Sequence, residues 1–258
     1  MRSTLKLVVA LLTIFSFTAQ AHMKLLVVGA TGATGRHVVK QLLEEKHSVA
    51  VIVRSRDRMI AALGDTPSDN LTITEASLLD LSDSEIKEHV KGVDVVVQTL
   101  GHNMDFKGMY GHPRKLVTDA AKRITQALGE NQKFVMMGTD GYAHPEDDPR
   151  SFTERSILTL LRWLVPPVSD NEDAADYLRT VSDVEWTVVR PTDLVDGEVS
   201  EYTLFDKPVG SLFGGGVATR SNVAKAMVDI ATTPSLWEKY KFHMPVVHDK
   251  LIEKKEEL

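Results

Sequence analysis

A glycine-rich turn near the start of the chain constrains the fold more than any other feature. Residues 29–35 read Gly-Ala-Thr-Gly-Ala-Thr-Gly, with a glycine at every third position. The apolar run of residues 24–28 leads into this turn and stops at Gly29, which is typical of a buried parallel strand. From Gly35 onward, apolar residues return at helical spacing as far as residue 45. A strand, a tight turn and a helix in immediate succession predict the opening unit of an α/β fold.

The same alternation continues along the chain. We expect further strands at residues 48–53, 71–74, 93–100, 133–137 and 186–189. We expect further helices at residues 56–63, 84–90, 113–128 and 221–231, with Ser82 or Asp83 capping the second and Pro113 in the first turn of the third. This rhythm implies right-handed crossovers and a doubly wound, mostly parallel sheet with helices on both faces. The 258 residues suit one domain of this kind, which we place at residues 22–250.

The composition excludes several classes of function. The net charge is −6 and Lys and Arg are scattered, so no basic patch favours a nucleic-acid partner. The chain has no cysteine, which excludes disulfides, thiolate catalysis and cysteine-ligated metals. His102, His112 and His144 follow expected strands, but they lack the close spacing of metal ligands, so we expect no metal site.

Residues 1–21 have the features of a secretory signal peptide. Arg2 and Lys6 supply the positive start, residues 7–17 form an apolar run, and Ala19-Gln20-Ala21 offers a small-x-small cleavage pattern. The apolar run is shorter than the about 18 residues that a spanning helix needs, so we expect no stable membrane span after cleavage. An uncleaved membrane anchor is the alternative.

The other end of the chain carries a matching signal. Lys255-Glu-Glu-Leu258 resembles the retrieval signals of the endoplasmic reticulum, although residues 251–258 could also be an ordinary charged tail. Asn70-Leu71-Thr72 is an N-glycosylation sequon in an expected surface loop. Together these features predict the lumen of the endoplasmic reticulum, with secretion, the periplasm or the cytoplasm as alternatives.

The spacing of the glycine turn is typical of dinucleotide-binding Rossmann-type domains. Gly29 allows the tight turn out of the strand, Gly32 lets the backbone approach a pyrophosphate, and Gly35 lets the helix pack close to the sheet. The free N–H groups at the helix start then face the phosphates. Because strand and helix flank the motif, we interpret it as a dinucleotide site rather than a structural turn.

The residues at the end of the second expected strand indicate which dinucleotide the protein binds. NAD-binding domains keep an acidic residue there for the ribose hydroxyl, whereas this chain has Arg54, followed by Ser55, Arg56 and Arg58. A guanidinium can bind a 2′-phosphate that a carboxylate would repel. We therefore expect NADP(H) as the cofactor, with an ordinary surface arginine as the alternative reading of Arg54.

The glycine turn, Arg54, the strand ending Leu100-Gly101, Arg190-Pro191 and the segment Ser221-Asn-Val-Ala224 together resemble a known group. They are similar to the atypical short-chain dehydrogenase/reductases, in particular to NAD(P)H-binding proteins similar to flavin reductase/biliverdin-IXβ reductase and to NmrA-like proteins. The resemblance covers residues 24–232 and is most specific at the glycine turn.

The resemblance implies roles for single residues. It assigns the 2′-phosphate to Arg54, the adenine to Leu78, the neighbourhood of the nicotinamide to Thr139 after the fifth strand, and the nicotinamide ring to Pro191. It assigns binding of the pyrophosphate to Gly29, Thr31, Gly32, Ala33, Thr34 and Gly35. Leu100 and Gly101 would line the cofactor beside the fourth strand.

The chain departs from the classical members at their catalytic pair. Those members use Tyr-x-x-x-Lys, but Tyr177 is followed four residues later by Val181, and Arg179 lies on another face of the helix. We name Thr139 and Tyr177 as candidate catalytic residues. Tyr142, His144 and Asp193 are further candidate proton donors.

The segment of residues 157–167 is apolar nearly all round. A lid over an apolar substrate, a membrane-leaning helix, a dimer surface and ordinary core packing all fit this pattern. Asp170-Asn171-Glu172 follows directly, and we expect it to cap the next helix.

Two classes of function remain. The first is an NADPH-dependent oxidoreductase that transfers hydride to a small or flat organic acceptor, with a small-molecule substrate and a homodimer as an option. The second is a non-catalytic NADP(H)-binding sensor or scaffold. An epimerase is a weaker third, because it normally needs the tyrosine base.

Overall fold

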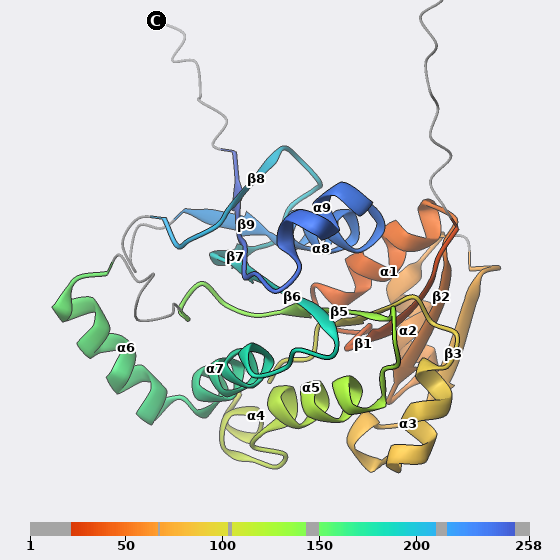
Figure 1. The fold of residues 1–258 in the computed structure, drawn as a ribbon, viewed down its shortest axis with the longest axis horizontal. Helices are drawn as coiled ribbons and strands as arrows, with labels where there is room; N and C mark the ends of the chain where they lie inside the picture. The colour runs from red at the N-terminus through yellow and green to blue at the C-terminus, as the bar shows by residue number, and fades with distance from the viewer. Residues whose placement is uncertain (1–21, 67, 103–104, 143–149, 210–215, 251–258) are drawn as a thin grey trace, which may run out of the picture.

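An eight-stranded sheet forms the centre of the fold, in the order β3-β2-β1-β4-β5-β6-β10-β8 (Figure 1). The computed structural model describes residues 22–66, 68–102, 105–142, 150–209 and 216–250. Neighbouring strands of this sheet are parallel except β10 and β8. The strands of the sheet are β1 (Lys24–Val28), β2 (Ser48–Val53), β3 (Leu71–Glu75), β4 (Val95–Gln98), β5 (Lys133–Met137), β6 (Glu185–Pro191), β8 (Tyr202–Phe205) and β10 (Val246–Asp249).

Helices cover both faces of the sheet, as Figure 1 shows. Two buried apolar clusters separate the layers: one packs α1, α2, α8 and α9 onto one face, and the other packs α3, α5 and α7 onto the opposite face. The helices are α1 (Gly35–Glu44), α2 (Arg56–Leu63), α3 (Asp83–Val90), α4 (Phe106–Tyr110), α5 (Leu116–Ala127), α6 (Phe152–Leu164), α7 (Pro166–Arg179), α8 (Arg220–Thr232) and α9 (Pro234–Tyr240).

The central strands supply both clusters because side chains alternate along a strand. In β1, Leu25 and Val27 join the α1 and α8 side, while Leu26 and Val28 join the α3 and α5 side. A strand that is buried on both faces must be apolar throughout, which is the pattern the sequence shows here. The predicted doubly wound, mostly parallel α/β fold is therefore confirmed.

Several elements were not predicted from the sequence. Strands β8 and β10 extend the sheet beyond β6, and β7 (Asp193–Val195) pairs with β9 (Val217–Thr219) in a separate two-stranded ribbon. These segments are three or four residues long and only partly buried, so they carry little periodicity. Strand β4 also ends at Gln98, two residues before the expected Leu100.

The start of α5 differs from the prediction. The helix begins at Leu116 rather than near Pro113, and its N-cap residue makes no capping bond. The side chain of Asp170 caps it instead, accepting hydrogen bonds from the backbone N–H of Val117 (2.8 Å) and Thr118 (3.0 Å). The expectation that Asp170-Asn171-Glu172 caps the following helix is wrong, because these residues lie within α7 and Asp170 caps α5.

The apolar segment at residues 157–167 does not form ordinary core. It spans most of α6 and the start of α7, and in Figure 1 α6 projects from the end of the molecule. Leu158 is the one residue of α6 that is buried. The core-packing interpretation of this helix is therefore wrong.

Both expected targeting signals lie outside the described residues, since these begin at His22 and end at Lys250. No helix in the described ranges is long and apolar enough to span a membrane. Asn70 of the sequon lies in an exposed turn before the edge strand β3.

Candidate cofactor-binding site

The site lies where the strand order of the sheet reverses. Strand β1 is flanked by β2 on one side and by β4 on the other, so the connections that follow β1 and β4 leave a crevice at their carboxyl ends. The two strand ends are joined directly: the backbone N–H of Thr99 donates to the carbonyl of Val28 (2.9 Å), and the Thr99 hydroxyl donates to the same oxygen (3.1 Å). The glycine turn starts at this junction.

Close approach of backbones requires two of the three glycines. Gly29 has φ of +80°, and a Cβ there would lie 2.6 Å from the carbonyl carbon of Thr99. A Cβ on Gly35 would lie 2.2 Å from the carbonyl oxygen of Gly29. Gly32 has more room, since its Cβ would meet the same oxygen at 3.0 Å. The turn therefore brings the start of α1 against the ends of β1 and β4, where only glycine fits.

The N-terminus of α1 is uncapped, unlike those of several other helices. Thr34 makes no side-chain capping bond, and the first turn of α1 holds no acidic residue. By contrast, a serine or threonine side chain caps each of α2, α3, α6 and α8. A helix start that has no side-chain cap and carries the positive end of the helix dipole is suited to a phosphate.

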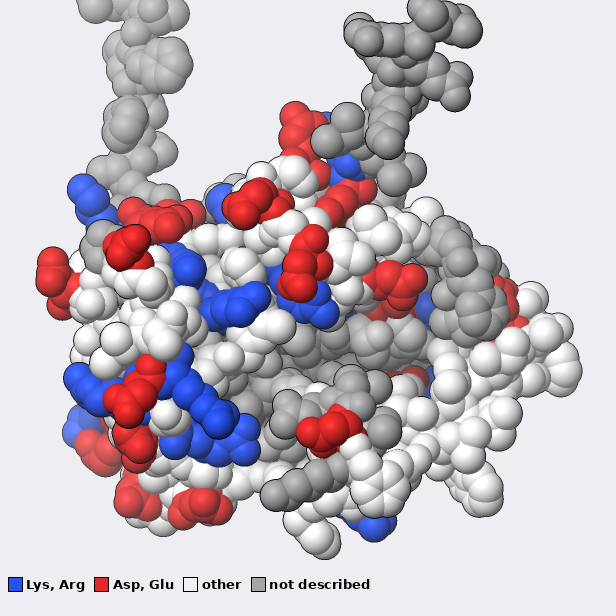
Figure 2. Space-filling view, turned by 180° about the vertical axis from the view of Figure 1, so that it is seen from behind, with Lys and Arg blue, Asp and Glu red and all other residues white. Residues whose placement is uncertain are grey.

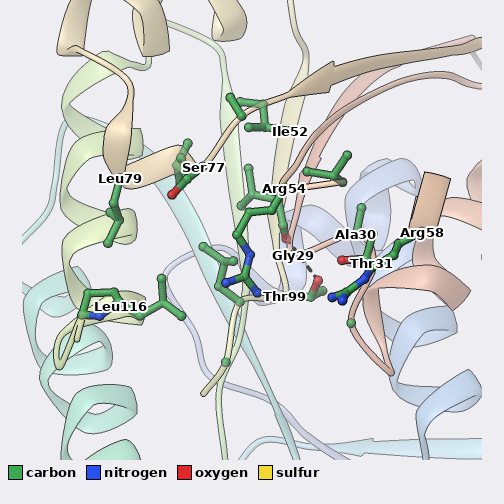
Figure 3. A pocket seen from close by; sticks show the side chains of 18 residues that line it. Gly29, Ala30, Thr31, Ile52, Arg54, Arg58, Ser77, Leu79, Thr99 and Leu116 are labelled. Carbon is green, nitrogen blue, oxygen red and sulfur yellow. Dashed lines mark hydrogen bonds between the residues drawn. The ribbon is translucent and has the colours of Figure 1, made fainter. Parts of the chain in front are cut away.

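A cavity of about 290 Å³ opens in front of this turn. Figure 3 shows the side chains of Arg54 and Arg58 pointing into it, from the end of β2 and from α2. Neither guanidinium makes a hydrogen bond or an ion pair with any described residue, whereas Arg56 turns away and donates to the carbonyl of Ile73 (3.4 Å). Two unpaired cations facing one cavity form a site for an anion.

Most of the predicted cofactor residues line this cavity. They are Gly29, Thr31, Gly32, Arg54, Leu78, Leu100 and Gly101. Ala33, Thr34 and Gly35 lie behind it in the turn and the helix start. Other lining residues were not predicted to contact the cofactor. Several of them lie in loops or near helix starts, whose position depends on the tertiary fold, among them Ser77, Leu79, Thr99, Pro113 and Leu116.

Comparison with known protein families decides the assignment. A family model described as NAD(P)H-binding matches residues 29–234, which is most of the chain. This chain belongs to the NAD(P)H-binding family. The match begins at Gly29, the first residue of the turn that forms the cavity wall. A comparison with curated protein sequences finds no significant relative.

Solved structures share the fold of this NAD(P)H-binding protein at low sequence identity. A protein assigned as an NADH-flavin reductase from Streptococcus pneumoniae superposes with a TM-score of 0.64 at 23% identity, over 88% of this chain and all (100%) of that one. The oxidoreductase ylbE from Lactococcus lactis gives 0.64 at 18%, covering 88% and 91%. ChuY, an anaerobillin reductase from Escherichia coli O157:H7, gives 0.61 at 16%, covering 89% and 98%. At these low identities, the similarity to the solved structures shows that the fold is shared and nothing more.

Thr139 and Pro191 lie further along the same edge of the sheet, outside the cavity. Thr139 follows β5 and Pro191 ends β6, the adjacent strand. The hydroxyl oxygen of Thr139 accepts a hydrogen bond from the backbone N–H of Gly141 (3.1 Å), and the carbonyl of Pro191 accepts one from Asp140 (3.0 Å). A dinucleotide that starts in the cavity and crosses the ends of β4 and β5 would pass Thr139.

Tyr177 lies in the interface between helices, not at the edge of the sheet. Its ring packs against the apolar cluster under α5 and α7, and its hydroxyl lies 2.8 Å from the hydroxyl of Thr125 on α5. Tyr142 is buried and its hydroxyl donates to Asp176 (2.5 Å). Burial, together with this carboxylate, raises the pKa of Tyr142 to about 12. Asp193 is exposed at the start of β7, His112 precedes Pro113, and His144 lies outside the described residues.

The imidazole of His102 is held inside the protein. Its Nε2 lies 2.7 Å from the Oδ2 of Asp170, and its Nδ1 lies 3.2 Å from the carbonyl oxygen of Gly108. The side chains of His102 and Asp170 are 4% and 1% exposed. This histidine therefore ties the loop after β4 to α7 and to the start of α5.

The electrostatic influence of Asp140 and His248 on each other was not predicted from the sequence. Burial raises the pKa of Asp140, although the charges of Arg150 and His248 oppose this shift. Burial lowers the pKa of His248, and its Nε2 has no hydrogen-bond partner among the described residues. His248 lies near the end of β10, a strand that was not predicted, so its position beside the loop after β5 was not foreseeable.

Proposed function

We propose that this protein is an NADPH-dependent reductase that transfers hydride to a small or flat organic acceptor. The observation that carries the proposal is that the guanidinium groups of Arg54 and Arg58, which have no partner among the described residues, face the cavity beside the glycine turn (Figure 3). A 2′-phosphate is the part of NADPH that NADH lacks, and two guanidinium groups bind a phosphate through several charge-assisted hydrogen bonds.

Different residues of the cavity would contact different parts of the cofactor. The N–H groups at the start of α1 would hold the pyrophosphate, the side chain of Leu78 would pack on the adenine, and Leu100 and Gly101 would form the wall toward the nicotinamide. NADPH supplies the hydride when it is bound, so the protein's contribution is to bind, orient and exclude water.

Thr139 is our candidate for the group that contacts the acceptor. Its oxygen accepts from Gly141, and its own proton has no acceptor among the described residues, so it is available for donation. A hydroxyl placed there stabilises the negative charge that develops on the acceptor as hydride arrives. We assign Tyr177 a structural role, because its hydroxyl is already engaged with Thr125 on α5.

The names of structural relatives support this reaction class. One is assigned as an NADH-flavin reductase and another is called an anaerobillin reductase, so both names denote reductases of organic molecules. We propose on these grounds that the protein is a reductase of the atypical short-chain dehydrogenase/reductase type.

A non-catalytic NADP(H) sensor is the second candidate. It is favoured by one observation: the two tyrosines considered as proton donors both have hydroxyls that are already engaged, Tyr177 with Thr125 and Tyr142 with Asp176. A sensor would bind NADPH through the same cavity and turn over nothing.

We further propose that the protein works in the lumen of the endoplasmic reticulum. This rests on the signal-like residues 1–21, the terminal Lys-Glu-Glu-Leu and the sequon at Asn70, which is exposed.

The test of function is a turnover screen. The purified full chain is mixed with NADPH and with flavins, quinones or aldehydes. Oxidation of NADPH is followed as the loss of its near-ultraviolet absorbance. Turnover with any acceptor class supports the reductase. Tight NADPH binding in calorimetry without turnover on any of them would favour the sensor, and absence of NADPH binding would contradict both.

A further inference from the structure

Helix α6 carries an apolar stripe on its outer side that no described residue covers. We define the α6 stripe as Phe152, Ser156, Thr159, Leu160 and Trp163, which recur at helical spacing along one face. Phe152 and Trp163 are each 86% exposed and Leu160 is 56% exposed. In Figure 2 this end of the molecule, on the right, is largely free of charged side chains. Exposure of large aromatic residues to this degree marks a contact surface rather than an ordinary helix face.

The polar groups within the stripe are already satisfied by the helix itself. The hydroxyl of Ser156 donates to the carbonyl of Phe152 (2.9 Å), and that of Thr159 donates to the carbonyl of Arg155 (2.8 Å). Hydroxyls bonded one turn back can be covered by apolar groups without leaving a proton unpaired. The stripe can therefore be buried at little polar cost.

Both arginines of α6 have partners within the protein. The Nε of Arg155 donates to the carbonyl of Arg150 (3.0 Å), and Arg162 pairs with Glu172 of α7. Arg155 is held by the segment just before its own helix and Arg162 by the neighbouring helix, and both remain at least partly exposed. The outer face of the helix is left apolar and neutral.

The helix is formed independently of any cover over the stripe. Ser151 and Glu154 make a reciprocal capping box at its start. At its other end the hydroxyl of Tyr110, on α4, donates to the carbonyl of Leu164 (2.9 Å). The exposed apolar residues are therefore displayed by an anchored helix, not by a frayed one.

The apolar surface continues from α6 onto α4 and is large enough to form the centre of an interface. Leu164 is 50% exposed, and the ring of Tyr110 packs at a tilt of 46° against that of Phe106, which is 78% exposed, with the ring centres 5.1 Å apart. With about 150–250 Å² for a large aromatic side chain, Phe106, Phe152 and Trp163 alone present on the order of 450 Å². Stable complexes bury about 800 Å² per partner, including a polar rim. This surface supplies the apolar centre that such an interface needs.

The chemistry of the surface selects its occupant. A helix that lies on a membrane needs Lys and Arg beside its apolar face to meet anionic lipids, but the arginines of α6 are bound to the protein and the chain carries a net charge of −6. A second copy of the same neutral stripe has no such requirement, and a two-fold axis lets one surface complement itself. We propose that α6 is a homodimer interface, in which two copies of the helix pack antiparallel across a two-fold axis. This proposal does not depend on the proposed function.

A single cysteine tests the contact, since the chain has none of its own. Thr159 lies next to the middle of α6. In an antiparallel pair of these helices, Thr159 of one protomer would therefore lie close to Thr159 of the other. The full chain carrying Thr159→Cys should form an intermolecular disulfide rapidly under mild oxidation at micromolar concentration. Ser84→Cys, on the exposed surface of α3, is the matched control and should form the intermolecular disulfide far more slowly, because it lies outside the proposed contact. Equal rates for the two variants would overturn the proposal.

Sedimentation equilibrium tests the stripe without a cross-link. The full chain should sediment as a dimer, and Trp163→Ala should raise the dimer dissociation constant by roughly 30-fold or more, as for a central aromatic contact. Ile60→Glu replaces an apolar residue of α2 that is 52% exposed and should leave the dimer unchanged. A monomeric wild-type chain would contradict the proposal. A monomer that floats with phosphatidylcholine–phosphatidylserine vesicles would overturn it in favour of a membrane.

Discussion

His102 and Asp170 form a buried pair, with the imidazole Nε2 2.7 Å from the carboxylate Oδ2. The same carboxylate accepts from the backbone N–H groups of Val117 and Thr118 and from the Thr118 hydroxyl. One side chain of α7 thus holds both the loop that follows β4 and the first turn of α5. Leu116, at the start of α5, and Gly101, beside His102, both line the cavity.

Removing this carboxylate should destabilise the protein strongly. Asp170→Ala leaves a buried imidazole and two backbone N–H groups without their acceptor, and loss of one partner of a buried pair costs about 3–5 kcal/mol. Asp173→Ala is the matched control on the same helix. It breaks a pair with Lys115 in which the carboxylate is 48% exposed, and should cost about 1 kcal/mol or less. Urea unfolding of both variants measures the difference, and equal losses would show that Asp170 is not the cap of α5.

Two glycines of the site should respond differently to a side chain. Gly35→Ala places a Cβ 2.2 Å from the carbonyl oxygen of Gly29, so it should lower both the melting temperature and NADPH affinity. A Cβ on Gly101 would meet no atom within 4 Å, and this residue lines the cavity, so we choose Gly101→Val for comparison. It should leave the melting temperature of the free protein unchanged and weaken cofactor binding by blocking the space. Normal NADPH binding by Gly101→Val would mean that the cofactor does not pass this wall.

Turnover should depend on Thr139 more than on Tyr177. Loss of one donor that stabilises the transition state costs on the order of 10²-fold in rate, so we expect about that loss for Thr139→Val. Tyr177→Phe should keep its rate and lose some stability, because its hydroxyl contacts Thr125 instead. Steady-state rates with NADPH compare the two. A large loss of turnover confined to Tyr177→Phe would reverse the assignment.

Targeting should require both ends of the chain. If residues 1–21 direct entry and Lys255-Glu-Glu-Leu258 directs retrieval, deletion of the last four residues should release the protein into the medium of expressing cells. Immunoblots of medium and lysate measure this, with the intact chain as control. Retention of the truncated protein in the lumen, or a cytoplasmic location of the intact chain, would contradict the proposed compartment.

Local patterns predicted the part of the site that is local in sequence. The strand, the glycine turn and α1 occupy residues 24–44, and their bounds follow from apolar spacing and from three glycines. The start of α5 could not be predicted in this way, because the backbone N–H of Val117 is capped by Asp170, whose side chain comes 53 residues later in the sequence. The same limit explains why His248 was missed: β10 is short, and it joins the sheet only through its pairing with β6 and β8.

The exposed face of α6 marks another limit of sequence reasoning. The segment around Leu160 and Trp163 has the composition of a core helix, yet both residues are more than half exposed. Apolar spacing indicates that a face must be covered, but it does not indicate whether the cover comes from the same chain or from another.

The central claim is that Arg54 selects NADPH through its 2′-phosphate. Calorimetric titration of Arg54→Asp tests it, with Arg56→Asp as a control that makes the same charge change at a side chain turned toward Ile73. NADPH should bind about 2–4 kcal/mol more weakly to Arg54→Asp, roughly 30- to 700-fold, while NADH binding changes little. Arg56→Asp should bind both cofactors nearly as the wild type does. Equal losses of NADPH and NADH affinity in Arg54→Asp would contradict the account.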